Sequence, residues 1–362
     1  MFEIYKGKRI LVTGHSGFKG AWLSAWLTSI GAEVRGISLA PDSNQPSLHQ
    51  IMGPDSYAES FYADIRDYAL MEKLIHEFKP DCVMHLAAQA LVRHSYAEPL
   101  ETFSTNVMGT ANILEACRHL ETPPAIVCVT TDKVYHNADW AWPYRETDPL
   151  GGKDPYSASK AASEIVAGAY RDTMFQLDNK EGPSMATVRG GNVIGGGDWA
   201  VDRIIPDAVR AAGSGGSLSI RNPDAVRPWQ HVLELCHGYM TLGEKLMSES
   251  KKDYIGAWNF GPNPMDIVTV YELAKKLKEN WSEVDLNIEL GADPSLPETR
   301  YLTLDISKSM RELRWVPGLT VWESIQMTGD WYDAYFANPE DVADITYKQI
   351  QDYSAKREAR IK

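Results

Sequence analysis

The sequence has few cysteines and no long apolar run. Its 362 residues include four cysteines, which lie far apart and form no CxxC pair: Cys82, Cys117, Cys128 and Cys236. This spacing argues against a disulfide-stapled secreted domain and favours free, buried thiols in a reducing compartment. No uncharged stretch reaches the ~18 residues that a membrane span needs. The amino-terminal segment is charged and runs at once into a glycine-rich turn, so we expect no signal peptide and a soluble, cytoplasmic protein.

Basic residues and metal-binding patterns are scarce as well. Lys and Arg number 36 against 49 Asp and Glu, which gives a net charge of −13 and argues against a nucleic-acid-binding protein. The nine histidines form no HExxH motif and no Cys/His cluster, so we expect no metal, and the lack of GxSxG disfavours an α/β-hydrolase. The hydrophobic fraction of 44% and the charged fraction of 23% are those of a globular protein.

Short apolar segments alternate with helix-like segments through the first half of the chain. Residues 9–13, 82–88 and 125–131 are apolar almost throughout, as strands buried on both faces are. Helical spacing lies between such segments, and the longest examples cover Leu100–Leu120 and Ser157–Tyr170. The pattern predicts an α/β fold, a doubly wound parallel sheet of the Rossmann type with ligands at the carboxyl ends of its strands.

The alternation weakens beyond about residue 195, where Gly and Pro become frequent. We therefore expect a first domain over residues 1–195 and a smaller, mainly substrate-binding domain over residues 196–338. Segments such as Trp258–Phe260 are expected to return to the main sheet. The polar tail, residues 339–362, is expected to form a loosely docked helix.

A glycine-rich turn follows the first predicted strand. The sequence Gly14-His15-Ser16-Gly17-Phe18-Lys19-Gly20 reads GxxGxxG and opens a helix. In such a turn the first glycine permits the tight bend, the second lets the backbone approach a pyrophosphate, and the third allows close packing of helix on strand. The motif predicts that the first domain binds a dinucleotide.

The acidic residue that usually holds the adenosine ribose is missing. Its place at the end of the second strand, ~20 residues on, is taken by Ser38, and the nearest carboxylate is Asp42. A serine can accept a 2′-hydroxyl or a 2′-phosphate, so these residues leave NAD and NADP open, and we favour NAD. Asp64-Ile65, after the next strand, suits a carboxylate that accepts from the adenine amino group; the alternative is an exposed cap of the following helix.

Tyr156 and Lys160 form a YxxxK motif at the start of a predicted helix. The four-residue spacing places both side chains on one face. A lysine ammonium near a phenol favours the phenolate, which is then a base able to take a proton from a sugar hydroxyl. The alternative for an isolated YxxxK is a surface pair, but here a GxxGxxG turn lies upstream.

These motifs together resemble the extended short-chain dehydrogenase/reductase family, and the resemblance covers the chain to about residue 330. Further marks are His85-Leu86-Ala87-Ala88, Asn106 with Gly109-Thr110, and Arg189-Gly190-Gly191-Asn192-Val193. The resemblance implies that the Leu86–Ala88 loop lies along the cofactor and that Asn106 supports the backbone of the active site. One departure is Lys19, where the wider family commonly has an apolar residue.

The triplet Thr131-Asp132-Lys133 after the fifth predicted strand narrows the resemblance to the sugar-nucleotide 4,6-dehydratases. Epimerases of the family carry Ser or Thr here without an acid–base pair, and many dehydratases carry Thr-Asp-Glu. An Asp-Lys pair resembles the subfamily that acts on CDP-glucose, a step toward deoxysugars of surface polysaccharide such as lipopolysaccharide O-antigen. Supporting segments are residues 140–146, 151–156, 195–199 and 202–207.

The resemblance implies a redox-neutral reaction on a sugar nucleotide. Tyr156 takes the 4-hydroxyl proton while hydride leaves C4 for NAD, with Thr131 near the 4-oxygen. Asp132 is the acid at the 6-hydroxyl and Lys133 the base at C5, before hydride returns to C6. Lysine is protonated at neutral pH unless its environment intervenes: burial near Lys160 and the oxidised nicotinamide would lower its pKa, and Asp132 would raise it.

The substrate diphosphate needs hydrogen-bond donors, and family position suggests Asn192, Arg203, Arg227 and Arg300. Arginine suits phosphate because its fork binds two oxygens at once; a solvated surface arginine is the alternative for each. Four tryptophans are candidates for packing against the sugar or base, with ordinary loop packing at least as well supported: Trp140, Trp142, Trp199 and Trp229.

Two other functions fit parts of the pattern. A 4-epimerase, or another sugar-nucleotide dehydratase, would share the fold, but an epimerase needs no acid or base at C5 and C6. A catalytically silent dinucleotide-binding sensor would not need Thr131, Tyr156 and Lys160 together. The family also pairs subunits through two long helices each, which here are about 100–120 and 157–170, so we expect a homodimer or a dimer of dimers.

Overall fold

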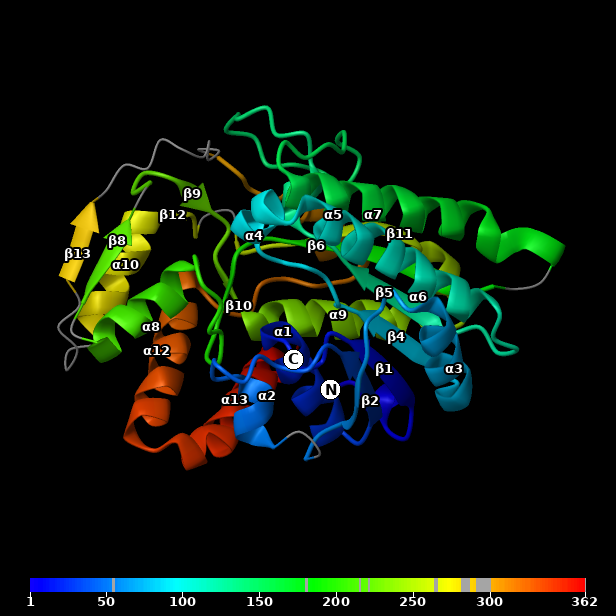
Figure 1. The fold of residues 1–362 in the computed structure, drawn as a ribbon, viewed down its shortest axis with the longest axis horizontal. Coiled ribbons are helices and arrows are strands. Elements are labelled where there is room, and N and C mark those ends of the chain that lie inside the picture. Colours follow the sequence, from blue (N-terminus) through cyan, green and yellow to red (C-terminus); the bar gives the residue numbers. More distant parts are fainter. Residues whose placement is uncertain are drawn as a thin grey trace.

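The chain folds around one seven-stranded parallel sheet, seen in a computed structural model that describes residues 1–53, 56–179, 182–214, 216–220, 222–263, 266–280, 287–290 and 301–361 (Figure 1). The strand order is β11-β6-β5-β4-β1-β2-β3, and every neighbouring pair is parallel. This confirms the predicted doubly wound fold. The strands are β1 (Arg9–Thr13), β2 (Glu33–Ser38), β3 (Glu59–Tyr62), β4 (Cys82–His85), β5 (Ala125–Val129), β6 (Ser184–Gly190) and β11 (Gly256–Phe260).

Alternate residues of each central strand enter two different cores. Leu11, Val83 and Ile126 pack on one face of the sheet, against α3 (Tyr68–Phe78), α6 (Gly109–Arg118) and α7 (Pro155–Asp172). Val12 and Val127 pack on the other face, against α1 (Phe18–Ser29) and α9 (Val232–Leu246). Burial on both faces explains why these strands are continuously apolar instead of alternating.

The region beyond residue 195 contributes to both parts of the molecule. As expected, residues 258–260 return to the sheet within β11, and α9 covers the sheet beside α1. The remainder forms a smaller unit that lies to one side in Figure 1. Its elements are β7 (Val193–Ile194), α8 (Ile204–Ser214), β8 (Ser217–Ile220), β9 (Val226–Arg227), β10 (Gln230–His231), β12 (Val268–Thr269), α10 (Val270–Asn280), β13 (Asn287–Leu290) and α12 (Val321–Ala337). The short α11 (Ser307–Glu312) packs on β11 of the main sheet instead.

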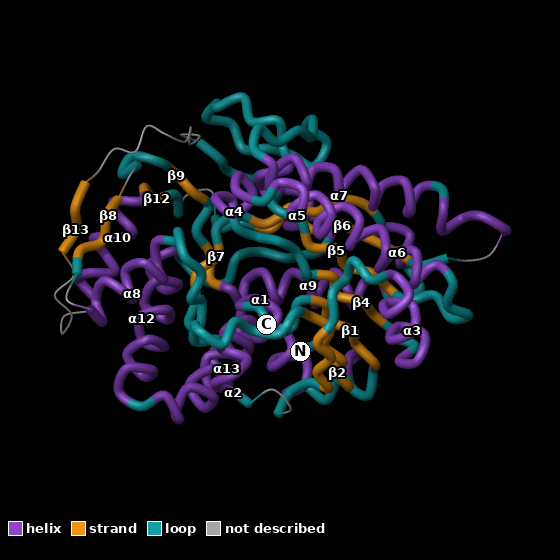
Figure 2. Tube along the Cα trace, in the orientation of Figure 1, coloured by secondary structure: helices purple, strands orange, loops and turns teal. Residues whose placement is uncertain are grey.

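The polar tail forms a long helix, α13 (Val342–Ile361), which packs beside α1 and α2 (Leu48–Met52) (Figure 2). It is held more firmly than its composition indicates, because a few buried side chains anchor it. The Tyr353 hydroxyl donates to Glu234 Oε2 of α9 at 2.8 Å. Arg357 is also buried and donates to the carbonyl of Val316.

The predicted helix at 100–120 is interrupted by a π-helical turn. The segment consists of α5 (Pro99–Phe103), the π turn Ser104–Met108 and α6, and it follows the short α4 (Val92–Ala97). π turns are rare and are frequently found at functional sites. This one contains Asn106.

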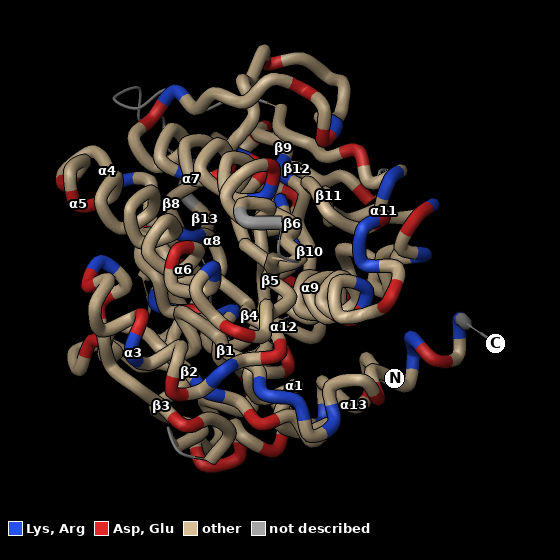
Figure 3. The backbone as a smooth tube through the Cα atoms, turned by 90° about the vertical axis from the view of Figure 1, so that its right-hand side faces the viewer, with Lys and Arg blue, Asp and Glu red and all other residues tan. Residues whose placement is uncertain are grey.

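The four cysteines are buried and unpaired, as predicted. Among the described residues, no helix combines the length and apolarity needed to cross a membrane. Lys and Arg are interspersed with Asp and Glu along the chain in Figure 3, without forming one basic face in that view.

Candidate active site

The glycine turn between β1 and α1 can accept only glycine at two of its positions. Gly14 has φ of 77°, and a Cβ there would lie 2.8 Å from the backbone nitrogen of Ala87. A Cβ on Gly20 would lie 2.1 Å from the carbonyl oxygen of Gly14. The first turn of α1 has no side-chain cap, because Gly17 stands at its N-cap. The backbone N–H groups at the start of α1, and the close approach of the glycine turn to the backbone at Ala87, fit the pyrophosphate of a dinucleotide.

The side chains within this turn pack toward β2. The ring of His15 packs directly over Gly36: a Cβ on Gly36 would lie only 2.1 Å from His15 Cγ. The Nε2 atom of His15 is 3.0 Å from Ser60 Oγ. Burial, with His49 nearby, lowers the pKa of His15 to about 4, so the ring is neutral at pH 7. Ser38, predicted at the ribose, donates to Ser16 Oγ at 2.7 Å. The serine that replaces the usual acid therefore braces the turn.

Asp64 and Ile65 follow β3 at the same edge. The Asp64 carboxylate forms a two-pronged ion pair with Arg66, and its hydrogen bonds from Arg66 hold its pKa below the usual range. Ile65 is buried and packs so closely on Gly109 that a Cβ there would lie 2.4 Å from Ile65 Cδ1. Asp64 thus has a partner already, whereas Ile65 packs into the core beside α6.

The Leu86–Ala88 loop runs past the end of β1. The backbone N–H of Leu86 donates to the Thr13 carbonyl at 3.1 Å, and that of Ala87 donates to Thr13 Oγ1 at 3.2 Å. Asn106 joins this loop to α7: its Oδ1 accepts from the Gln89 backbone at 2.8 Å, and its Nδ2 donates to Ser159 Oγ at 2.8 Å.

Tyr156 and Lys160 project from the start of α7, where Asp154 caps the helix by accepting from the Ser157 N–H at 2.9 Å. Lys160 Nζ donates to the Val129 carbonyl at the end of β5, at 2.8 Å. Burial raises the pKa of Tyr156 to about 12, and Asp132 adds to this, while Thr131 and Arg203 oppose it. Burial lowers the pKa of Lys160. Ligand-free Tyr156 is therefore a phenol.

The triplet forms a tight turn immediately after β5, beside Tyr156. Thr131 Oγ1 donates to Asp132 Oδ1 at 3.0 Å, and Thr131 also acts to lower the pKa of Tyr156. Asp132 is only 2% exposed, and burial raises its pKa, while Lys133, Thr131 and Arg227 pull it down. A carboxyl group with a raised pKa keeps its proton to a higher pH than a free one, which suits a general acid. Lys133 is partly buried beside it.

Two of the predicted substrate arginines approach the same place. Arg203 pairs with Asp198 at 2.9 Å, and its charge reaches Tyr156, while Arg227 is buried and its charge reaches Asp132. Asn192 lies nearby in the chain segment beside β10, where its carbonyl accepts from the Gln230 N–H at 3.0 Å. Arg300 lies outside the described residues.

Lys19 points toward the catalytic end of the crevice. Burial, with Arg203 and Lys160 nearby, lowers the pKa of Lys19 to about 8, and Asp132 partly offsets this. The residue predicted as part of the glycine turn thus joins the triplet and the YxxxK pair electrostatically.

The four tryptophans do not gather in one place. Trp140 stacks on Tyr144 with ring centroids 5.6 Å apart, and Trp142 is 72% exposed. Trp199 packs on aromatic residues of α12, and Trp229 is buried. Ordinary packing accounts for Trp199.

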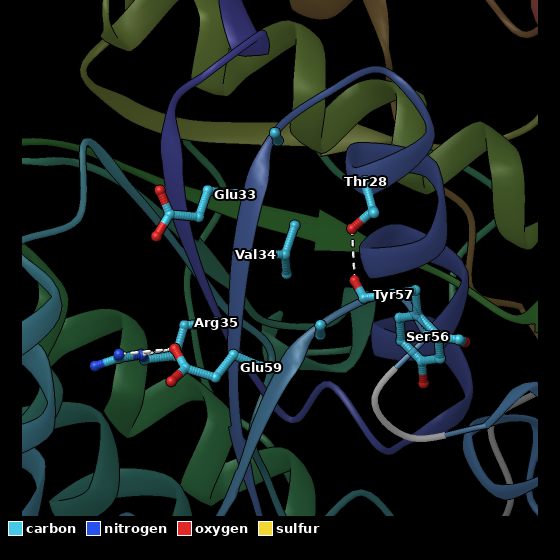
Figure 4. Close-up of a pocket in the computed structure, with 9 residues that line it drawn as sticks. Thr28, Glu33, Val34, Arg35, Ser56, Tyr57 and Glu59 are labelled. Carbon is cyan, nitrogen blue, oxygen red and sulfur yellow. Dashed lines mark hydrogen bonds and ion pairs between the residues drawn. The ribbon is translucent and has the colours of Figure 1, made fainter.

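An open pocket of about 590 Å³ lies away from these residues, at the amino-terminal ends of β2 and β3 (Figure 4). Its charged residues include Arg35 and Glu59, which pair with each other at 2.7 Å. Because ligands of doubly wound sheets bind at the carboxyl ends of strands, this pocket is at the wrong end for the reaction.

Sequence reasoning missed several residues that organise the site. No motif of the sequence marks Gln89, Ser159 or Glu164, and Arg189 stands out only as part of a motif. A usable signal exists for Glu164, which lies four residues after Lys160 and therefore on its face of α7. The polar residue pairs involved come from distant parts of the chain, which no spacing reveals.

Comparisons with known proteins show which family the chain resembles. A family model described as GDP-mannose 4,6-dehydratase matches residues 11–328. The CDP-glucose 4,6-dehydratase of Salmonella typhimurium strain LT2 is 45% identical over 354 residues, 97% of this chain and 97% of the relative. The dTDP-glucose 4,6-dehydratase of Xanthomonas campestris pv. campestris strain B100 is 28% identical over 341 residues, 89% of this chain and 92% of the relative. A solved dTDP-glucose 4,6-dehydratase, DesIV from Streptomyces venezuelae with NAD bound, has a TM-score of 0.75 and 26% identity, and the match covers 93% of this chain and 99% of that one.

Proposed function

The chain belongs to the nucleotide-sugar family of the GDP-mannose 4,6-dehydratase model, and from that premise we propose that it converts CDP-glucose to CDP-4-dehydro-6-deoxyglucose and water. It is an NAD-dependent hydro-lyase. The observation that carries the proposal is the buried Asp132 with Lys133 beside it, in contact through Thr131 with Tyr156. This set supplies one group for each proton that a 4,6-dehydration moves.

The glycine turn and the loop at Ala87 fit a bound NAD, because side chains on Gly14 and Gly20 would clash and the backbone itself is left to contact the cofactor. NAD, when bound, accepts hydride from C4, returns it to C6 and adds the positive charge of its oxidised ring. A group of the protein must remove the proton of the 4-hydroxyl, and we assign this role to the Tyr156 oxygen. Burial disfavours the phenolate, so its formation depends on Thr131 and on the cationic groups nearby, Arg203 among them.

Elimination then requires a base at C5 and an acid at the 6-hydroxyl. Lys133 takes the C5 proton, which the 4-ketone has acidified, and Asp132 protonates the departing oxygen so that water leaves. Lys133 later returns a proton to C5. At the end Tyr156 holds one proton too many and Asp132 one too few. Thr131 donates to Asp132 and influences the pKa of Tyr156, so we assign to its hydroxyl the return of the proton from Tyr156 to Asp132.

Substrate recognition is proposed for the second domain, residues 196–338, with Arg203, Arg227 and Arg300 at the diphosphate, together with Asn192 from just before that domain. Arg227 is buried and Arg203 is held by Asp198, so both are oriented before substrate arrives. Fixed guanidinium groups favour a bidentate grip on phosphate.

We expect turnover of CDP-glucose with only catalytic amounts of NAD. Product should greatly exceed added NAD, without lasting absorbance from reduced nicotinamide, because the hydride returns to the sugar. The value of kcat/KM for CDP-glucose should exceed that for dTDP- or GDP-glucose by about 100-fold, since lost base hydrogen bonds cost a few kcal/mol. Mass spectrometry of the product measures the loss of water.

Other outcomes of that assay identify the alternatives. A product of unchanged mass would indicate a 4-epimerase, and equal turnover of dTDP-glucose would contradict the proposed nucleotide preference. Accumulation of one reduced cofactor per sugar would indicate a simple dehydrogenase. A protein that binds NAD but changes no sugar nucleotide would be a sensor.

We also propose that the protein is a homodimer, or a dimer of dimers, paired through α5, the π turn and α7. These elements expose several large apolar side chains on the helical layer over the sheet. Leu100 is 83% exposed and Ile165 is 65% exposed, with Met108 also exposed between them in sequence. A group of exposed apolar side chains on one layer is a feature of surfaces that bind another chain.

The double substitution Leu100→Glu with Ile165→Glu is expected to give a monomer, because it places charge on both proposed contact helices. Size-exclusion chromatography with light scattering measures the mass, and circular dichroism checks the fold. Trp322→Glu is the matched control, since Trp322 is an exposed apolar residue of α12, on another part of the surface. An unchanged mass in the double variant would contradict this interface.

The proposed product belongs to the chemistry of 6-deoxysugars, which supports a place in the synthesis of surface polysaccharide such as lipopolysaccharide O-antigen. A location in the cytoplasm is proposed on the four buried, unpaired thiols.

A further inference from the structure

A buried carboxylate lies on α7 one helical turn after Lys160. Glu164 Oε1 accepts from Thr130 Oγ1 at 2.6 Å and from Arg189 Nε at 2.9 Å. Its Oε2 accepts from Thr187 Oγ1 at 2.7 Å and from Arg189 Nη2 at 3.1 Å. Four donors therefore fix this one side chain between α7 and the ends of β5 and β6.

Arg189 extends the same network to the far side of the catalytic turn. Its Nη1 donates to the Tyr135 hydroxyl at 2.9 Å and to the Glu146 carbonyl at 3.0 Å. The Tyr135 hydroxyl in turn donates to Asn259 Oδ1 of β11 at 2.7 Å. Arg189 and Glu164 are both almost fully buried, with side chains 4% and 3% exposed.

The triplet Thr131-Asp132-Lys133 thus lies between two anchored residues. Thr130, directly before it, binds Glu164, and Tyr135, shortly after it, binds Arg189. Glu164 also shares its helical face with Tyr156 and Lys160. One ion pair therefore connects both groups of proposed catalytic residues.

We propose that the Glu164–Arg189 ion pair positions the triplet Thr131-Asp132-Lys133 against Tyr156. It thereby sets the rate of the proton transfers that Tyr156 and the triplet carry out. This inference rests on the proposed function. Neither residue touches the reacting atoms. Apolar residues of similar volume often replace buried ion pairs without loss of stability, so stability alone gives little reason for this one. Proton transfer, by contrast, depends steeply on the geometry of the groups involved.

Two matched substitutions separate positioning from stability. Thr130→Val and Thr187→Val each remove one buried hydroxyl that lies 2.6 or 2.7 Å from the same carboxylate; the Thr130 hydroxyl also lies 3.0 Å from the Val188 carbonyl. Only Thr130 adjoins the triplet. We expect similar losses of melting temperature for both, but a fall in kcat of about 10-fold to 100-fold for Thr130→Val alone. KM for CDP-glucose should stay within about twofold in both, because the phosphate-binding groups are untouched.

Tyr135→Phe tests the second anchor, since it removes the hydroxyl but keeps the ring that stacks on Tyr144. It should lower kcat by a similar factor at constant KM. Arg189→Ala adds a chemical test. An open pocket of about 320 Å³ is lined by Glu164 and Arg189, and it gives guanidinium ion a route to the vacated place. Guanidinium should restore part of kcat in Arg189→Ala and should not activate Thr130→Val.

The wild-type enzyme is measured first, so that two failures can be told apart. No turnover of CDP-glucose would contradict the proposed function, and the variants would then be compared on whichever nucleotide-glucose is dehydrated. With an active wild type, an unchanged kcat in Thr130→Val and Tyr135→Phe would overturn the positioning role. Equal kcat losses in Thr130→Val and Thr187→Val would also overturn it, because they would indicate a general loss of structure.

Discussion

Lys133→Ala is expected to slow the loss of water by about 10²–10⁴-fold, while oxidation at C4 continues. The substitution removes the proposed C5 base but leaves Tyr156 and Lys160 in place on α7. Reduced nicotinamide and a 4-keto sugar that still carries its 6-hydroxyl should therefore build up in a single turnover. Stopped-flow absorbance follows the first, and quenched mass spectrometry follows the second.

Deuterium incorporation at C5 sharpens this experiment. Lys133→Ala should block exchange of the C5 hydrogen with solvent, whereas Asp132→Asn should stall elimination but allow exchange, since it keeps the base. Lys153→Ala is the control, because Lys153 is an exposed lysine just before α7. Dehydration by Lys133→Ala at the wild-type rate would mean that another group removes the C5 proton.

Tyr156→Phe should abolish the reaction at its first step. Without the phenolic oxygen, nothing in the proposed mechanism takes the 4-hydroxyl proton, and the contact with Thr131 is lost as well. We expect turnover to fall by about 10²–10⁴-fold, with no reduced nicotinamide detectable in a single turnover. This absence distinguishes Tyr156→Phe from Lys133→Ala, in which the reduced cofactor accumulates.

Tyr170→Phe provides the comparison for Tyr156→Phe. Tyr170 lies on the same helix, and its hydroxyl donates to Glu115 at 3.0 Å, so the control also removes one phenolic hydrogen bond from α7. It should retain wild-type kinetics. Rapid formation of reduced nicotinamide by Tyr156→Phe would contradict its role as the base at O4.

Features set by local spacing could be predicted from the sequence. The turn at Gly14–Gly20 and the helix at Tyr156 depend on residues close together in the chain, and the apolar strands reveal a sheet covered on both faces. The triplet was found because it directly follows β5. In each case a short segment contains the whole signal.

Features that depend on distant partners could not be predicted. Ser38 stands where a ribose ligand is usual, but its hydroxyl binds Ser16 across 22 residues. Glu164 meets Arg189 and Thr130 only after β5 and β6 are paired. The polar composition of the tail hides the few buried residues, such as Tyr353, that hold α13 on α9.

The position of β11 affects how the chain can fold during its synthesis on the ribosome. β6 is buried along its whole length, but its outer neighbour ends only at Phe260. Until that strand emerges, a nascent chain of the first 195 residues presents β6 as an open sheet edge, and α9 is missing from the face over Val127 and Val188. Open edges of this kind recruit other chains. The sheet of the cofactor-binding half is therefore completed only when β11 pairs with β6, after the intervening residues of the second unit have been synthesised.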